Sequence, residues 1–216
     1  NTQFFKFVEK NYVNWLSGKD ANAPTMSHTL IKNKFIPELE KNENVFLIVI
    51  DNLRYDQWKI IQPILQDYYK VEKEELYCSI LPTATQYARN ALFSGLMPSE
   101  MEKRHPEWWL NDEQEGGKNM HEEDFMHAQL KRLGKDIKFS YNKITNHAAG
   151  KKLSEGINNL LQNKLNVIVY NFVDMLSHAR TEMEVIRELA DDEPAYRSIT
   201  LSWIEHSPLM EIIKQL

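Results

Sequence analysis

Asn44-Val45-Phe46-Leu47-Ile48-Val49-Ile50 is the stretch that decides the fold, because it is apolar and rich in β-branched residues without a break. A strand that is buried on both faces has such a continuous run, whereas a half-buried strand alternates apolar and polar residues. The run ends in Asp51, and helical periodicity follows over residues 57–68. The sequence therefore predicts a strand of a parallel sheet that leads into a helix.

Three further strands are expected along the chain, and helical periodicity separates each from the next. They cover residues 77–81, 136–141 and 165–173, and the last of them ends in Asp174. Because strands alternate with helices, the fold class is α/β, an open and mostly parallel sheet with helices on both faces. The helical stretches are expected at residues 4–16, 25–41, 57–68, 87–93, 123–133, 148–162 and 181–189, and as one helix from 195 to the end.

A change of composition marks residues 99–121 as an irregular insertion or cap. The segment contains His105, the adjacent Trp108 and Trp109, and an acidic loop with two glycines. Aromatic side chains in such a segment can stack on nucleobases. The alternative is that the two tryptophans pack the cap onto the core or line a subunit contact.

Composition bounds the classes of function. The chain has 216 residues, 42% of them hydrophobic and 26% charged, which is typical of a globular domain with one sizeable core. The formal net charge of −5 excludes a general basic field for nucleic acid. The single cysteine, Cys78, excludes an internal disulfide framework and favours a reducing, cytoplasmic compartment. No apolar run is long enough for a transmembrane span.

Both ends of the sequence suggest a piece of a longer protein. The chain begins without Met, and it stops inside the apolar helical pattern that ends in Leu216. We therefore expect a domain covering residues 1–216 that is incomplete at its C-terminus.

Two threonine hydroxyls lie where the second expected strand meets a helix, in Pro82-Thr83-Ala84-Thr85. The first turn of a helix has free backbone N–H groups and a partial positive charge, which suit an anion such as phosphate. A threonine at this place can therefore act as a nucleophile. Taken alone, the motif is more typical of a helix N-cap that follows a proline turn.

Polar side chains also follow the first and fourth expected strands. Asp51 follows the first, and Asp174 with His178, four residues later, follows the fourth. The carboxyl ends of parallel strands meet at one edge of a sheet, and carboxylate and imidazole groups are zinc ligands. The alternatives are a helix cap at Asp51 and a solvated pair at Asp174 and His178.

In this order and strand context, the motifs resemble the alkaline phosphatase superfamily. Asp51-Asn52-Leu53-Arg54-Tyr55-Asp56-Gln57 together with Thr83-Ala84-Thr85-Gln86-Tyr87-Ala88-Arg89 resembles its PglZ branch. Closer still, the chain is similar to the PglZ domain of PorX-type response regulators. The resemblance covers most of the chain from Asn44 to His178.

The resemblance implies a two-zinc site with a threonine nucleophile. Thr85 would be the nucleophile, with Thr83 as the fallback, and Asp51 would bind the zinc that Thr85 approaches. Asp174 and His178 would bind the second zinc. The superfamily also uses a later Asp-His pair, usually in an Asp-His-Gly phrase, and a further His. The chain lacks that phrase, and the only later histidine, His206, lies in a helical run, so we expect the remaining ligands beyond Leu216 and no activity from residues 1–216 alone.

The implied reaction is hydrolysis of a phosphodiester, with a nucleotide or short oligonucleotide as substrate. Arg89 and Asn90, one helical turn beyond Thr85, and Arg54 could contact phosphate oxygens. For Arg89 and Asn90 the alternative is a pair on a helix surface.

The resemblance also implies a setting in the cell. The domain would be the output of a two-component response regulator that controls type IX secretion, with a receiver domain and a helical linker upstream. Its partners would include a histidine kinase, a sigma factor and a second copy in a homodimer. The alternative function is a non-catalytic PglZ module that works by binding the sigma factor or by mediating dimerisation.

Overall fold

The computed structural model describes residues 1–18, 20–110 and 117–216. The chain forms two compact units, each made of two segments. Unit 1 contains Asn1–Glu38 and Glu75–Lys135, and unit 2 contains Leu39–Glu74 and Asp136–Leu216. Each unit is described by itself.

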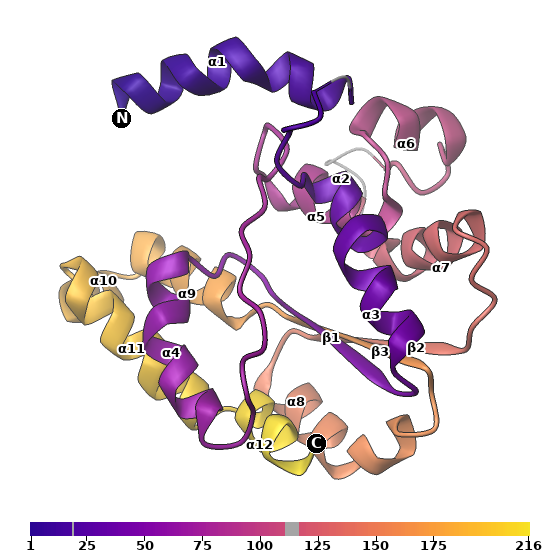
Figure 1. Cartoon of the computed structure of the whole chain (residues 1–216). Helices are drawn as coiled ribbons and strands as arrows, with labels where there is room; N and C mark the ends of the chain where they lie inside the picture. Colours follow the sequence, from indigo (N-terminus) through magenta and orange to yellow (C-terminus); the bar gives the residue numbers. More distant parts are fainter. Residues whose placement is uncertain (19, 111–116) are drawn as a thin grey trace. The chain divides into compact units, whose positions relative to one another are not determined.

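A parallel three-stranded sheet forms the centre of unit 2 (Figure 1). Its strands are β1 (Val45–Ile50), β2 (Phe139–Ile144) and β3 (Leu165–Tyr170), in the order β1-β3-β2. The three strands are in register, so that Ile50, Tyr170 and Ile144 are neighbours at the carboxyl edge. The α/β fold with a parallel open sheet flanked by helices is confirmed.

Side chains from alternate positions of the strands form the core of unit 2. Ile144, Ile168 and Tyr170 are buried in one cluster, with Ile48 packed against it. Strand β3 is buried at all six of its positions, because it has a strand on each side and both of its faces are covered. Apolar residues of four helices complete this cluster, and Figure 1 shows these helices on one face of the sheet: α4 (Tyr55–Gln66), α8 (His147–Glu155), α11 (Glu193–Glu205) and α12 (Pro208–Gln215).

Two more helices follow β3 in unit 2. Helix α9 (Phe172–Glu182) begins directly after the strand, and α10 (Glu184–Leu189) packs against it. Short 3-10 turns occur at Ile157–Leu160 in unit 2 and at Gly117–Met120 in unit 1.

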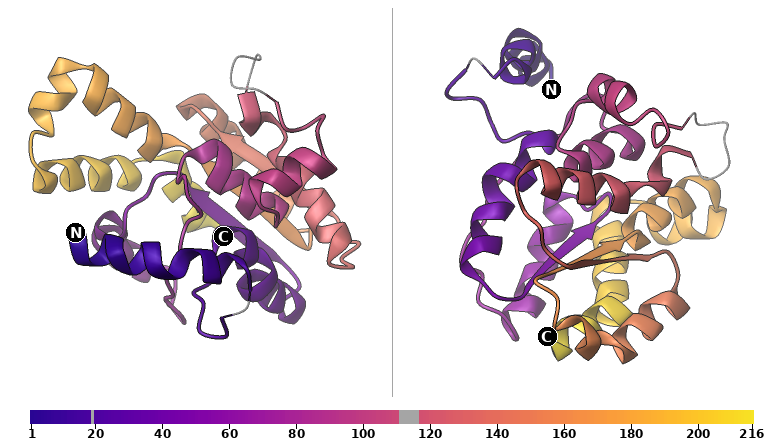
Figure 2. Two further views of the ribbon diagram at one scale, coloured as in Figure 1. Left: turned by 90° about the horizontal axis from the view of Figure 1, so that it is seen from above. Right: turned by 90° about the vertical axis from the view of Figure 1, so that its right-hand side faces the viewer.

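Unit 1 is helical, and α5 (Thr85–Ser94) is its central helix, between α2 and α7 (Figure 2). The fully buried side chains of unit 1 include Phe93, Met101 and Phe125. The other helices of this unit are α1 (Thr2–Leu16), α2 (Ser27–Leu30), a π-helical turn (Ile31–Phe35), α6 (Pro98–Arg104) and α7 (Glu122–Arg132), while α3 (Ile36–Lys41) runs from unit 1 into unit 2.

The prediction of a strand at residues 77–81 is wrong. Only Cys78 pairs there, in an isolated parallel bridge with Met26 of unit 1. The next backbone N–H groups donate to side chains, Ile80 to the Ser27 hydroxyl at 3.2 Å and Leu81 to the Tyr12 hydroxyl at 2.6 Å. These donors are satisfied without a neighbouring strand, so no ladder forms.

The strand expected at residues 165–173 stops earlier, at Tyr170, and Asp174 lies in the first turn of α9 rather than at a strand end. Phe172 and Val173 have high strand propensity, but here they anchor the start of a helix. Val173 is fully buried, and the Phe172 ring stacks on Trp203 with ring centres 4.3 Å apart. Tertiary packing therefore overrides the local preference. The strand expected at residues 136–141 is displaced to Phe139–Ile144.

The segment 99–121 is more regular than expected, although its residues 111–116 lie outside the described part. Helix α6 occupies its start, with Pro98 in the first turn. The Glu100 carboxylate accepts from the Met97 backbone N–H at 2.9 Å. A proline in the first turn and a glutamate three residues after the cap are helix-start signals that the sequence already contained.

The aromatic residues of this segment contact rings of the same unit. Trp108 stacks on His105 with ring centres 4.3 Å apart, and Phe125 meets its edge. Trp109 lies 5.9 Å from the ring of Tyr87. This arrangement agrees with the alternative in which the tryptophans pack the segment onto the core.

Four expected helical stretches are interrupted. The stretch 148–162 is divided into α8 and the 3-10 turn, and within 181–189 helix α9 ends at Glu182 and α10 begins at Glu184. The stretch 25–41 consists of α2, the π-helical turn and α3. The C-terminal helix is divided into α11 and α12 at Ser207, whose hydroxyl caps α12 by accepting from the Met210 N–H at 3.2 Å. Among the described helices, none combines the length and apolar character needed to cross a membrane.

Stability should depend strongly on the central strand. We predict that Ile168→Ala lowers the free energy of unfolding by about 3 kcal/mol, because Ile168 is fully buried and the shorter side chain leaves a cavity. Val185→Ala, at an exposed position of α10, is the control and should change it by less than about 0.5 kcal/mol. Urea unfolding followed by circular dichroism measures both, and equal effects would contradict the assignment of β3 as the core strand.

Candidate functional site

The carboxyl edge of the sheet places Asp51 beside the end of β3. The Asp51 N–H donates to the Tyr170 carbonyl at 3.0 Å, which extends the pairing of β1 and β3 by one residue. On the other side of β3, the Asn171 N–H donates to the Ile144 carbonyl at 3.2 Å. The backbone therefore fixes the residues that follow β1 and β3, before any side chain contributes.

Asp174 and His178 lie on one face of α9, one turn apart. His178 Nε2 is 3.8 Å from Asp174 Oδ2, and His178 Nδ1 is 3.8 Å from a carboxylate oxygen of Glu182. The imidazole is 67% exposed, so it is accessible to a ligand. Because α9 starts directly after β3, the helix carries this pair to the same edge as Asp51.

The side chains at this edge are of types that bind zinc, but there are few of them. Zinc is bound by carboxylate oxygens and imidazole nitrogens, and Asp51, Asp174 and His178 supply both. A structural or catalytic zinc ion needs three or four protein ligands. Within residues 1–18, 20–110 and 117–216, no group of three or more His, Cys, Asp or Glu side chains lies close enough to hold a metal ion. Asp51, Asp174 and His178 therefore follow the strands at one edge of the sheet without forming such a group in the described part of the chain.

Thr85 belongs to unit 1, where it is the first residue of α5. The N-cap is Ala84, whose methyl side chain can neither donate nor accept a hydrogen bond. Neither threonine therefore has the capping role that the sequence suggested. The Thr85 hydroxyl is half-buried and makes no hydrogen bond with the part of the chain that is described. Thr83 lies two residues earlier, on the exposed loop.

Arg89 and Asn90 are buried, so the helix-surface interpretation of this pair is wrong. Arg89 Nε donates to the carboxylate of Glu122 at the start of α7, and the two side chains are 5% and 1% exposed. Asn90 is fully buried and its amide donates to the Gln86 carbonyl at 3.0 Å. Arg89 thus joins α5 to α7 within unit 1, while this bond of Asn90 lies within α5.

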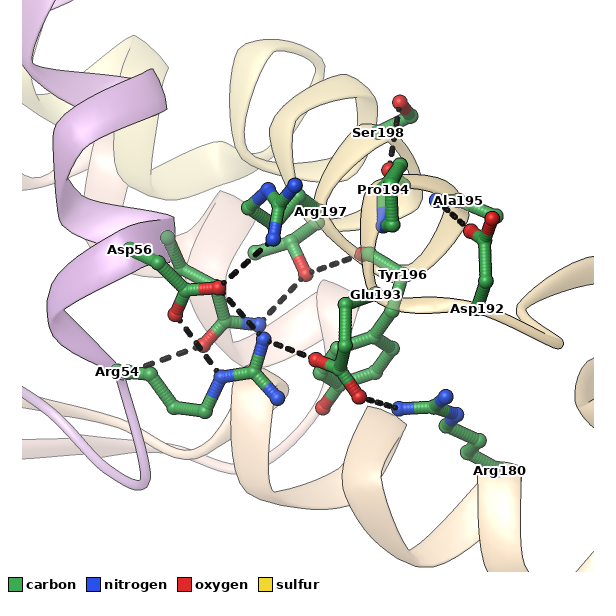
Figure 3. Close-up of polar contacts among 12 residues, drawn as sticks. Arg54, Asp56, Arg180, Asp192, Glu193, Pro194, Ala195, Tyr196, Arg197 and Ser198 are labelled. Carbon is green, nitrogen blue, oxygen red and sulfur yellow. Dashed lines mark hydrogen bonds and ion pairs between the residues drawn. The ribbon is translucent and has the colours of Figure 1, made fainter.

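Arg54 is the N-cap of α4 and the centre of an ion-pair network in unit 2 (Figure 3). Its guanidinium donates to both oxygens of Asp56, at 3.0 and 2.8 Å, and lies 2.5 Å from Glu193. Arg180 contacts the other oxygen of Glu193 at 3.2 Å, and Arg197 contacts Asp56 at 3.1 Å. The network ties the starts of α4 and α11 to α9.

The electrostatics of the network follow from these contacts. The Arg54 guanidinium, with Arg197 beside it, lowers the pKa of Asp56 from 3.8 to about 2. Arg54 and Arg180 likewise lower the pKa of Glu193, and the two carboxylates raise the pKa of Arg54. Asp56, Glu193 and Arg54 are therefore ionised at neutral pH.

Sequence reasoning identified Arg54 but missed its partners. Arg180, Glu193 and Arg197 lie far from it in the chain, and no local pattern connects them. The available signal was the helix start at Asp192, whose carboxylate accepts from the Ala195 N–H at 2.7 Å and which precedes Pro194.

His206 occurs at the end of α11 rather than inside a helix. Its Nδ1 lies 2.7 Å from the Ser202 carbonyl. It borders a mainly apolar cavity of about 250 Å³ near the carboxyl ends of β2 and β3, with His147, Phe172 and Trp203.

Comparison with known protein families gives a match to most of the chain. Residues 30–215 match the family described as "BREX system PglZ alkaline phosphatase-like domain". The match spans both units and includes every candidate residue considered above. A comparison with curated proteins gave no match.

The buried pair of Arg89 and Glu122 should dominate the stability of unit 1. We predict that Arg89→Ala lowers the free energy of unfolding by about 3–5 kcal/mol, because it leaves a buried carboxylate without its cation. Arg104→Ala removes an exposed arginine 4.0 Å from Glu100 and should cost less than about 1 kcal/mol. Denaturant unfolding tests this, and a stable Arg89→Ala protein would show that Arg89 has no structural role.

The lowered pKa of Asp56 predicts a pH dependence of stability. Because its folded-state pKa, about 2, lies below the ordinary value of 3.8, the stabilisation is present above pH 3.8 and is lost as the pH falls through about 2. Asp56→Asn should therefore be less stable than the wild type at pH 6, and the difference should disappear near pH 2. Unfolding curves between pH 6 and pH 2 measure it, and a constant difference would refute the assignment.

Proposed function

Because the chain belongs to the PglZ family of alkaline phosphatase-like domains, we propose that it is a zinc-dependent phosphodiesterase with Thr85 as nucleophile. The observation that carries the proposal is the state of Thr85. Its hydroxyl is half-buried at the first turn of α5 and is not used for capping or for any other hydrogen bond in the described part of the chain. A threonine hydroxyl at a helix start that has no structural hydrogen bond can act as a nucleophile.

The reaction would proceed in two displacements at phosphorus. Thr85 Oγ1 attacks phosphorus and the P–O bond to the first alcohol breaks, so that the alcohol leaves with the proton that Oγ1 gives up and the phosphoryl group stays on the threonine. Water then attacks the same phosphorus, its oxygen stays on the phosphate, and the Thr85 oxygen leaves with one of the water's protons. The partial positive charge at the N-terminal turn of α5 favours the negative charge that develops on the phosphoryl oxygens.

Asp51, Asp174 and His178 would be metal ligands. Bound zinc would supply Lewis-acid stabilisation of the reacting oxygens and lower the pKa of a bound hydroxyl group. The residues fit by donor type, while the described residues lack a group of three, so the proposal requires further ligands.

The substrate class and the setting are further parts of the proposal. We take a nucleotide or a short oligonucleotide as substrate, in an output domain of a two-component regulator of type IX secretion. The support is the resemblance of the chain, over most of residues 44–178, to the PglZ domain of PorX-type proteins. The family description instead names the BREX system, which is the competing setting.

One observation favours the second candidate, a PglZ module that works by binding a sigma factor or a second copy. The described residues hold no complete metal-ligand group, and Arg89, a candidate for phosphate binding, is committed to a buried ion pair. A binding module would keep the fold and need neither zinc nor Thr85.

A single comparison separates the two candidates. We predict that the native protein contains zinc and hydrolyses bis-nitrophenyl phosphate, and that Thr85→Val lowers kcat by at least about 10³-fold, because the nucleophile is removed. Thr83→Val is the matched control, at the exposed loop position, and should keep most of the activity.

Two results would count against the enzyme. One is equal turnover by wild type and Thr85→Val. The other is full turnover after the metal content has been brought to zero with a chelator. A loss of activity in Thr83→Val with a normal Thr85→Val would move the nucleophile to the fallback position.

A further inference from the structure

A cavity of about 480 Å³ in unit 2 is lined by three arginines from three different elements. Arg54 comes from the start of α4, Arg180 from α9 and Arg187 from α10. The rest of the wall is polar for the most part and includes Asn52, Ser177, Thr181, Ala190, Asp191 and Tyr196. An arginine-rich cavity with one carboxylate in its wall suits an anionic ligand.

Two of the arginines already hold an anion, the carboxylate of Glu193 (Figure 3). Arg54 contacts one of its oxygens at 2.5 Å and Arg180 the other at 3.2 Å. The ring of the buried Tyr196 supports both guanidinium groups, whose central carbons are 5.2 and 4.7 Å from the ring centre. The side chains are thus set for a two-oxygen anion.

The side chain of Glu193 is partly open to solvent. Its side chain is 52% exposed and lies at the first residue of α11. An exposed ion pair contributes little to stability, so a ligand with a higher charge can take the carboxylate's place at small cost.

Arg187 is the arginine whose charge is not balanced. Its guanidinium donates to the Thr181 carbonyl at 2.7 Å, and no other side-chain hydrogen bond joins it to residues 1–18, 20–110 or 117–216. Within the described part of the chain, no carboxylate lies within ion-pair distance of its guanidinium, and that includes Asp191 in the same wall. Most of its five N–H donors are therefore available to a ligand.

The cavity is next to the proposed metal ligands in the chain. Asn52 follows Asp51, and Ser177 precedes His178. We propose that this cavity binds a phosphate group of the substrate other than the one that reacts. The substrate class is then a phosphoester that carries two or more phosphate groups. The inference about the substrate rests on the proposed function, whereas the existence of an anion site does not.

The test is binding of inorganic pyrophosphate to the protein at low salt, measured by titration calorimetry with a chelator present. Under these conditions neither zinc nor the nucleophile takes part. We expect Arg187→Ala to weaken binding by about tenfold or more, because hydrogen bonds to a charged group are lost. Lys151→Ala, which removes an exposed charge from α8 in the same unit, should stay within about threefold of the wild type.

A second variant separates a ligand site from a purely structural network. Glu193→Gln keeps the side-chain length but removes the competing charge, so pyrophosphate should bind more tightly than to the wild type. Circular dichroism confirms that both variants are folded. Equal affinity of Arg187→Ala and Lys151→Ala, or weaker binding to Glu193→Gln, would overturn the proposal.

The outcomes also keep this inference apart from the proposed function. If Arg187→Ala loses pyrophosphate while Thr85→Val retains turnover of the diester, the anion site holds and the threonine mechanism fails. If Thr85→Val is inactive and pyrophosphate does not bind, the enzyme proposal holds and the anion site is refuted.

Discussion

The pairing of β3 with a parallel strand on each side is the constraint on which unit 2 depends. All six residues of β3 are buried, and its register with β1 and β2 is unbroken. Because parallel strands in register end together, the segments that follow them start at one edge. Asp51, the start of α9 and the start of α8 are close for this reason, and the side-chain chemistry of the edge depends on a backbone arrangement.

The sequence predicted those parts of the fold that local patterns determine. Val45–Ile50 was recognised as a strand from its continuous β-branched run, but the predicted burial on both faces is wrong, because β1 is an edge strand and all six of its residues are half-buried. Residues 77–81 looked similar, but Ser27 and Tyr12 take their N–H groups, and both side chains are distant in the sequence. Phe172 and Val173 likewise became the start of a helix because Trp203 covers them. In the last two cases, contacts with residues distant in the sequence explain why the structure differs from the prediction.

For the candidate site, the sequence supplied residue types and order, while the charge partners came only from the structure. Asp174 and His178 were predicted to act together, and their spacing of one helical turn places them 3.8 Å apart. Arg89 and Arg54 were predicted to meet phosphate, yet one is buried against Glu122 and the other is shared by Asp56 and Glu193. Charge patterns along a chain do not encode which distant carboxylate a given arginine will meet.

The hydrogen bond from the Asp51 N–H to the Tyr170 carbonyl has a consequence for protein engineering. It fixes position 51 through the main chain, so the geometry there does not depend on which side chain the residue carries. A different donor group could be introduced at this position while the strand end stays in place. The edge of this sheet is therefore a scaffold on which the ligand chemistry can be exchanged separately from the fold.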